Sequence, residues 1–271
     1  MGKLTSAEDL VVESKIPKYY FDEAIYAKRN YDGRQEINET SPLVVGPNIK
    51  DWPDMPALKE NLLLKVVSYI TDEVTTTDEL IPSGETSAYR SNPYKLADFT
   101  LSRVDPEYVD RAKAVYNDCG DFEAGNYETL GEIAERAIQF VDLKNTSYGS
   151  TIFAKKPGDG SAREHAASCQ KVLGAWGNIA CEYATKRYRS NLINWGIVPF
   201  IIKDLTQIAK EDYILIPNII GAIQNDEAII KAYVLNETIQ EIELFLGQLT
   251  ASEKEIIISG NLINYHKSLL R

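Results

Sequence analysis

One short loop carries the residue types best suited to chemistry. Residues 158–165 read Gly-Asp-Gly-Ser-Ala-Arg-Glu-His, and the alanines and apolar residues that follow predict a helix whose first turn lies at Ser161. Two glycines allow backbone conformations that other residues avoid, so the free N–H groups of this turn can converge on an anion. Ser161 and Arg163 are placed to share such an anion-binding loop.

The same serine has a purely structural interpretation. Ser161 followed by Glu164 is the capping-box pattern, in which the two side chains satisfy backbone N–H groups and no ligand is needed. Capping boxes are far more common than catalytic serines, so the pattern taken alone favours a cap. A structural domain that binds no ligand therefore stays open as one alternative.

A second segment adds an acid and another arginine. Residues 76–84 read Thr-Thr-Asp-Glu-Leu-Ile-Pro-Ser-Gly and place Asp78 in a threonine-rich turn that proline and glycine end, and Arg90 follows a few residues later. Guanidinium groups bind carboxylates through two parallel hydrogen bonds and stay charged at any working pH. Arg90 and Arg163, together with Ser161, therefore suit a ligand that carries several carboxylates.

These two segments resemble the mobile C-terminal swivelling domain of the aconitase superfamily. That domain carries a Gly-x-Gly-Ser-Ser-Arg-Glu-His loop preceded by a Thr-Thr-Asp-His-Ile-x-x-x-Gly turn, and the interval from Asp78 to Arg90 matches that of mitochondrial-type aconitases. Residues 190–199 are similar to the segment that closes the same domain. The resemblance covers roughly residues 60–200, and the serine loop is its most specific part.

The resemblance implies a reaction and a role for each loop residue. The reaction is that of a hydro-lyase, the dehydration or hydration of a hydroxy di- or tricarboxylic acid. Ser161 would be the base that removes a carbon-bound proton beside a carboxylate, its charged form stabilised by loop amides and arginines. Arg90 and Arg163 would bind the substrate carboxylates, with Gly160 and Ala162 lining the same site.

Two positions depart from the family pattern. Ala162 stands where aconitases usually carry a second serine, and Glu79 stands where the turn usually has histidine. The resemblance implies that Asp78 orients or hydrogen-bonds active-site groups. These departures resemble bacterial aconitase-like hydratases more than the citrate-handling enzyme, so the resemblance implies a hydratase without naming its substrate.

The family reaction uses a [4Fe–4S] cluster that three cysteines hold in another domain. This chain has Cys119, Cys169 and Cys181, which form no Cys-x-x-Cys pair and are expected to be structural thiols, while His165 and His266 are too few and too far apart to add a metal site. The resemblance therefore implies a cluster-bearing partner, on the same polypeptide or as a separate large subunit as in isopropylmalate isomerase. Alone, the chain is expected to be inactive.

Composition limits the other classes of function. The sequence has 271 residues, 44% hydrophobic and 25% charged, which predicts a globular protein, and its net charge of −11 argues against nucleic-acid and anionic-membrane partners. No run approaches the ~18 apolar residues of a membrane-spanning helix. The N-terminus lacks a signal-peptide pattern and the cysteines lack a disulfide pattern, so a cytoplasmic location is expected.

The expected fold is α/β, a three-layer β/β/α swivelling domain over residues 41–271 whose core lies at about residues 60–200. An N-terminal arm or linker is expected over residues 1–40, with C-terminal helices after the core, and residues 254–271 fit either a helix or a strand pair. Expected strands lie at 61–70, 138–143, 151–154 and 178–183, and expected helices at 105–117, 128–137 and 226–245.

A rival function uses the same residues without catalysis. In a binding module, the glycine loop and Arg90 and Arg163 would hold an anionic metabolite for sensing or assembly, and no proton would move. The exposed aromatics of the N-terminal arm, such as Tyr19 and Tyr20, fit contact with other domains or with the chain's own core about equally well.

Overall fold

The computed structural model describes residues 2, 18–27, 29, 40, 42 and 44–270. The chain divides into two compact units, Met1–Val45 and Gly46–Arg271. In the first unit the described residues include a short helix, α1 (Glu23–Ala27), and the exposed aromatic side chains of Tyr19, Tyr20 and Phe21. Most of the predicted arm at residues 1–40 lies outside the described residues, so its role and its boundary stay predictions.

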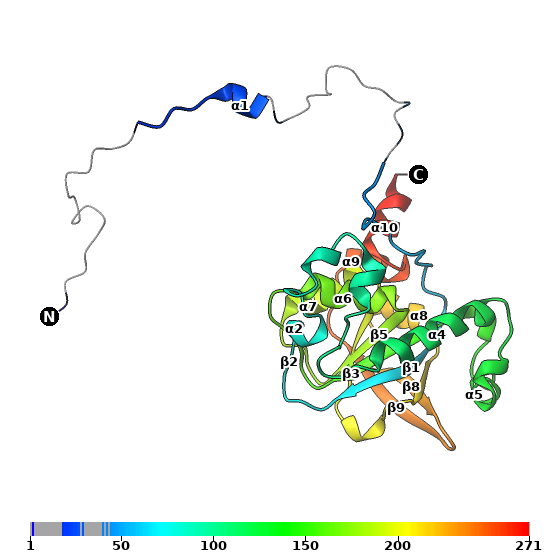
Figure 1. Cartoon of the computed structure of the whole chain (residues 1–271). Coiled ribbons are helices and arrows are strands. Elements are labelled where there is room, and N and C mark those ends of the chain that lie inside the picture. The colour runs from blue at the N-terminus through cyan, green and yellow to red at the C-terminus, as the bar shows by residue number, and fades with distance from the viewer. Residues whose placement is uncertain are drawn as a thin grey trace. The chain divides into compact units, whose positions relative to one another are not determined.

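The second unit is built on a closed barrel of seven strands (Figure 1). The barrel strands are β1 (Asn61–Ile70), β3 (Thr146–Ala154), β5 (Ala175–Ala180), β6 (Val198–Ile201), β7 (Tyr213–Ile216), β8 (Ile230–Leu235) and β9 (Ile239–Leu246). Around the barrel the order is β1, β3, β5, β6, β9, β8, β7; the first four are parallel to one another, and the remaining pairings are antiparallel. The predicted mixed α/β fold is confirmed. The three-layer β/β/α description is not, because these strands close into one barrel.

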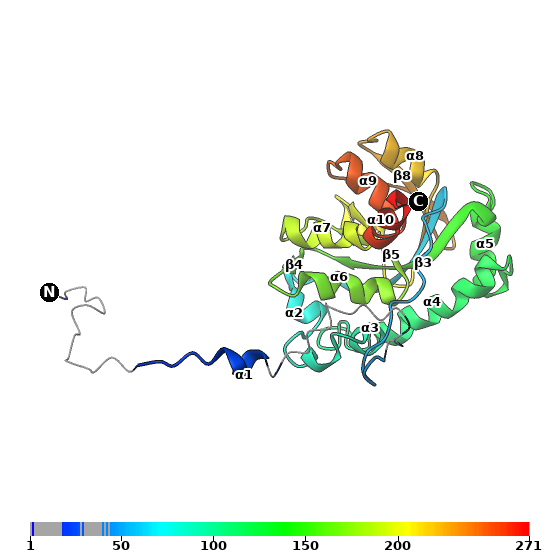
Figure 2. The same cartoon turned by 90° about the horizontal axis from the view of Figure 1, so that it is seen from above.

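Helices pack against the barrel (Figures 1 and 2). The α-helices are α2 (Thr77–Leu80), α3 (Pro93–Ala97), α4 (Tyr108–Glu123), α5 (Glu132–Ala137), α6 (Arg163–Val172), α7 (Lys186–Asn194), α8 (Ile219–Gln224), α9 (Ala251–Ile258) and α10 (Leu262–Leu269). Short 3₁₀ turns are η3 (Ser87–Tyr89), η4 (Glu128–Leu130), η5 (Leu143–Asn145) and η6 (Leu205–Gln207). In Figure 2, α6 lies between α7 on one side and α2 and α3 on the other.

Two hydrophobic cores explain why β1 is apolar along nearly its whole length. All seven barrel strands contribute to one cluster, which is therefore the barrel interior, and β1 supplies Leu62 and Leu64 to it. The other cluster lies between the strands and α3, α4 and α6, and it receives Leu63 and Val67. Because successive side chains of a strand point to opposite faces, a strand buried on both faces is apolar at both sets of positions.

Several expected elements are confirmed and two are wrong. The strand at 61–70 is present with the expected bounds, and the strand at 151–154 and the helices near 105–117 and 128–137 are present with shifted ends. The long helix expected at 226–245 is instead the hairpin of β8 and β9, in which Ile230, Ala232 and Val234 are buried with period two. The strand expected at 138–143 is a turn, and Ile138 is 60% exposed. Residues 254–271 contain the end of α9 and all of α10, so the helical alternative holds there.

The parallel pairing of β1 with β3 positions the two chemically interesting segments. Ile70, the last residue of β1, lies beside Ala154, the last residue of β3, so both strands end at the same edge of the barrel. Their continuations pair again as a small parallel sheet of β2 (Thr75–Thr76) and β4 (Pro157–Asp159). Loops at the carboxyl ends of parallel strands are the usual place for a site in α/β proteins.

Candidate functional site

The two segments singled out in the sequence are in direct contact. The Thr77 hydroxyl, at the start of α2, accepts a hydrogen bond of 3.2 Å from the Ala162 N–H, although these residues are 85 positions apart. Gly160 has a φ of +132°, and a Cβ built there would overlap the Thr77 hydroxyl oxygen. Only glycine therefore allows this backbone conformation and this close approach. Thr77 was not predicted as a site residue, because its partner is remote in sequence.

The serine loop is open at the start of α6. The helix begins at Arg163, two residues later than expected, and its N-cap Ala162 provides no side-chain cap. The capping-box interpretation of Ser161 and Glu164 is wrong: the Glu164 carboxylate accepts a hydrogen bond of 2.7 Å from the Trp195 indole N–H instead. Ser161 is exposed, and within the described residues its hydroxyl has no hydrogen-bond partner. The hydroxyl is thus free to meet a ligand.

A buried network of polar side chains from α6, α7 and β5 packs against the serine loop. Gly158 has a φ of +100°, and a Cβ built there would overlap the ring of Tyr188, a fully buried residue of α7. The Tyr188 hydroxyl accepts a hydrogen bond of 2.8 Å from the side-chain amide of Gln170. The side-chain oxygen of Gln170 in turn accepts a hydrogen bond of 3.1 Å from the Asn178 side-chain amide. The Thr185 hydroxyl, which also caps α7, donates 3.0 Å to the Gly158 carbonyl. These contacts fix the loop against α6, α7 and β5.

The Asp78 turn has its own cap and an arginine partner. Thr76 and Glu79 form a reciprocal capping box on α2, with the Thr76 N–H donating 2.6 Å to the Glu79 carboxylate. Glu79, which replaces the histidine of the family pattern, therefore has a structural role here. The Asp78 carboxylate forms an ion pair with Arg103, whose guanidinium also pairs with Glu85 at 2.5 Å. Arg103 was missed in the sequence because it lies 25 residues after Asp78.

Both predicted substrate-binding arginines lie at this edge of the barrel. The Arg163 guanidinium folds back and donates to the Gly160 carbonyl of the serine loop. Arg90 is exposed and donates 3.4 Å to the Ser83 carbonyl. Burial first, and then the positive charge of Arg90, hold the pKa of His165 below its ordinary value. The helix α3 begins three residues after Arg90 and packs against α6, so Arg90 lies near the helix that follows the serine loop.

The cysteines of the chain do not offer a cluster site. Burial raises the pKa of both Cys119 and Cys169 to about 12, which disfavours the thiolate that binds metal. The Cys119 thiol donates to the carbonyls of Val115 and Tyr148 at 3.2 and 3.3 Å. Among the residues that the structure describes, no three His, Cys, Asp or Glu side chains are grouped so as to hold a metal ion. The thiols do not fit an iron–sulfur cluster.

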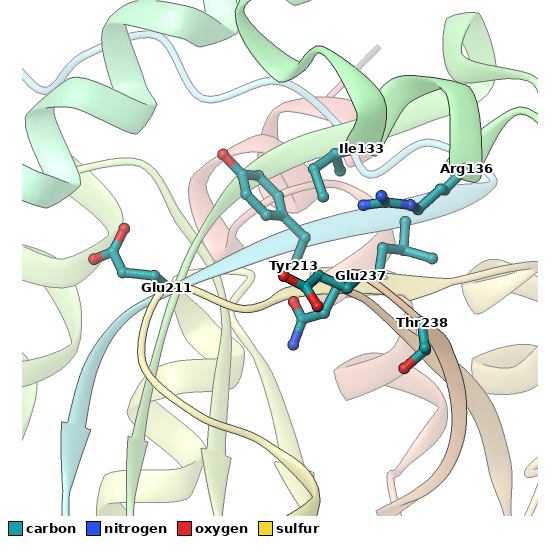
Figure 3. Close-up of a pocket in the computed structure, with 8 residues that line it drawn as sticks. Ile133, Arg136, Glu211, Tyr213, Glu237 and Thr238 are labelled. Carbon is teal, nitrogen blue, oxygen red and sulfur yellow. The ribbon is translucent and has the colours of Figure 1, made fainter.

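A separate surface depression of about 570 Å³ lies between α5 and the strands β7 and β8 (Figure 3). Its lining residues are Ile133, Arg136, Glu211, Tyr213, Leu235, Asn236, Glu237 and Thr238. Arg136 pairs with Glu132 at 2.5 Å, and Glu211 pairs with Lys65 at 3.0 Å, so two of the charges already have partners. None of the lining residues belongs to the serine loop or to the Asp78 turn.

No helix in the described ranges is long and apolar enough to cross a membrane. No protein-family model matches the sequence, and no curated protein matches it. Among solved structures, the chain is similar to 3-isopropylmalate dehydratase (leuD) from Methanocaldococcus jannaschii. The sequence identity is 21% and the TM-score is 0.49, and the match covers 77% of this chain and 95% of that chain.

Proposed function

We propose that this chain is the serine-bearing part of an aconitase-like hydro-lyase that dehydrates or hydrates a hydroxy di- or tricarboxylic acid. The observation that carries the proposal is the contact between Thr77 and the Ala162 N–H, which joins the Asp78 turn to the serine loop. The resemblance to the aconitase swivelling domain rests on these same two segments. In this proposal Ser161, Asp78, Arg90 and Arg163 share one surface.

The chemistry of this surface suits proton removal beside a carboxylate. Arg90 and Arg163 offer planar guanidinium groups that can each bind one carboxylate through two hydrogen bonds. An α-hydrogen next to a bound carboxylate would lie within reach of the exposed Ser161 hydroxyl. The serine is a weak base in water, and fixed positive charge together with the free N–H groups of the first turn of α6 favours its charged form.

The chain leaves the site incomplete on one side. Within the described residues the Ser161 hydroxyl contacts no acid or base that could take its proton. The group that binds the substrate hydroxyl, a [4Fe–4S] cluster in the family that the sequence resembles, would come from a partner domain or subunit. This chain would then supply Ser161, the two arginines and Asp78, and a cytoplasmic, cluster-bearing partner would cover them.

Turnover should appear only when the chain and its partner are combined. We expect the purified chain to show no dehydration of citrate, isocitrate or isopropylmalate. A mixture with a cluster-bearing, aconitase-type large subunit should form the unsaturated product of at least one of them. The measurement is the absorbance of that product, with each protein alone as the control. Turnover by the isolated, iron-free chain would contradict the proposal.

The exposure of Ser161, whose hydroxyl has no hydrogen-bond partner in the described chain, also fits an anion-binding module for sensing or assembly. The hydro-lyase and the binding module differ in whether the mixture of chain and partner forms product. A sensor would bind a carboxylate through Arg90 and Arg163 and would give no product in any mixture. It would also tolerate loss of the serine hydroxyl, because no proton moves.

A further inference from the structure

A short loop at the beginning of the second unit holds the segment that presents Arg90. The Asn48 side-chain amide donates a hydrogen bond of 2.7 Å to the Ala88 carbonyl. The Asn92 side-chain amide donates a hydrogen bond of 3.4 Å to the Asn48 side-chain oxygen. The Lys50 N–H donates 3.0 Å to the Ser91 carbonyl. Residues 48–50 therefore contact the backbone or side chains on both flanks of Arg90.

Other contacts hold the arginine segment, residues 85–92, on both sides of Arg90 but leave the Arg90 side chain itself loosely restrained. Thr86 donates 3.0 Å to the Pro82 carbonyl, and Glu85 is paired with Arg103. Asn92 caps α3 by accepting 3.2 Å from the Lys95 N–H. The Arg90 guanidinium makes one long bond of 3.4 Å to a backbone carbonyl, so the direction of its side chain depends on how well residues 88–91 are fixed.

We propose that Asn48 is a positioning residue for Arg90: it holds the Ala88 carbonyl before the arginine and the Asn92 side chain after it, so that the guanidinium is aimed at the surface beside the serine loop. The inference rests on the proposed function, in which Arg90 binds a substrate carboxylate. Holding a charged side chain in place before binding lowers the conformational entropy that binding must remove.

The test compares Asn48→Ala with the wild-type chain by NMR. In the absence of ligand, ¹⁵N relaxation of residues 86–92 should show larger amplitudes of fast motion in the variant, while residues 76–80 stay unchanged. Titration with citrate, followed at the Arg90 side-chain N–H, should show an affinity about three- to tenfold weaker, as expected for the loss of one or two hydrogen bonds. Thermal unfolding checks that the variant is folded.

Asn264→Ala is the matched control, and Arg90→Gln separates this inference from the proposed function. The Asn264 amide also donates 2.7 Å to a remote carbonyl, that of Met55, but it does not bond to the arginine segment. Its replacement should leave citrate affinity unchanged. If Arg90→Gln weakens citrate binding and Asn48→Ala changes neither motion nor affinity, the role of Asn48 is refuted while the proposed function stands. If Arg90→Gln has no effect on citrate binding, the proposed carboxylate role fails, and the role of Asn48 fails with it.

Discussion

Replacement of Ser161 by alanine is expected to lower turnover by the combined chain and partner by a factor of about a hundred to ten thousand, the range typical for loss of a general base. The affinity for citrate should change by less than about threefold, because the arginines supply the carboxylate contacts. The change removes one exposed oxygen that has no hydrogen-bond partner in the described chain, so the free energy of unfolding should hardly change. Initial rates and calorimetry measure the two effects separately.

Ser252→Ala is a suitable control for that variant, because Ser252 is also an exposed serine near the start of a helix, α9. Its turnover should equal that of the wild type. A Ser161→Ala variant with undiminished turnover would show that another group takes the proton. Equal losses of binding and turnover would instead indicate that Ser161 acts mainly in binding.

Lys171→Met is expected to stabilise the protein by about 3 to 5 kcal/mol at pH 7, at ~1.4 kcal/mol per pKa unit. Lys171 lies on α6 and is 5% exposed, and burial lowers its pKa from 10.5 to about 7. Its ammonium nitrogen lies 3.5 Å from the centroid of the Trp176 ring and 3.4 Å from the Gly196 carbonyl oxygen. These two contacts favour the charged form and offset part of the cost of burial.

Because the pKa of Lys171 is lower in the folded protein than in the unfolded chain, the stabilisation by Lys171→Met should depend on pH. Below pH 7 both folded and unfolded chains hold the Lys171 proton, and the cost of burying the charge is complete. Between pH 7 and 10.5 the unfolded chain binds more protons, so wild-type stability rises with pH relative to the variant. Denaturant unfolding at pH 6.5 and 9.5 should therefore show the advantage of Lys171→Met shrinking by about 3 kcal/mol.

Lys231→Met, at an exposed lysine that pairs with Glu241 at 3.2 Å, is the control for lost surface charge, and its effect should stay below about 1 kcal/mol. Comparing each variant with the wild type at the same pH removes the contribution of all other titrating groups. An advantage of Lys171→Met that is the same at both pH values would mean that the lysine keeps its proton inside the protein.

The family resemblance implied that the two loops meet, and the pairing of two parallel strands brings them together. Each segment follows an apolar strand, and strands that are parallel neighbours bring their carboxyl ends to one edge of the barrel. The glycines at 158 and 160 also signal the positive φ values that the loop adopts. What the sequence did not show was which side chain occupies the contact, because Thr77 and Ala162 are joined only by the register of β2 with β4.

The wrong predictions for residues 226–245 and for the Ser161 cap arose because contacts between residues remote in sequence decide the structure there. The segment 226–245 has apolar residues at spacings compatible with a helix, but β8 and β9 complete the barrel between β7 and β6, and pairing there decides their conformation. Ser161 fits a capping box in sequence, yet Trp195 binds Glu164 and removes one half of the box. Arg103 and Asn48 support the site from positions that no short motif could connect with it.

The most direct test of the site is a map of backbone amide shifts as citrate is added to the wild-type chain. If the serine loop and the Asp78 turn form one carboxylate-binding surface, the shifts should be concentrated in residues 76–80, 88–91 and 159–165. Shifts concentrated instead around the depression lined by Arg136, Tyr213 and Glu237, or no shifts at all, would contradict that claim.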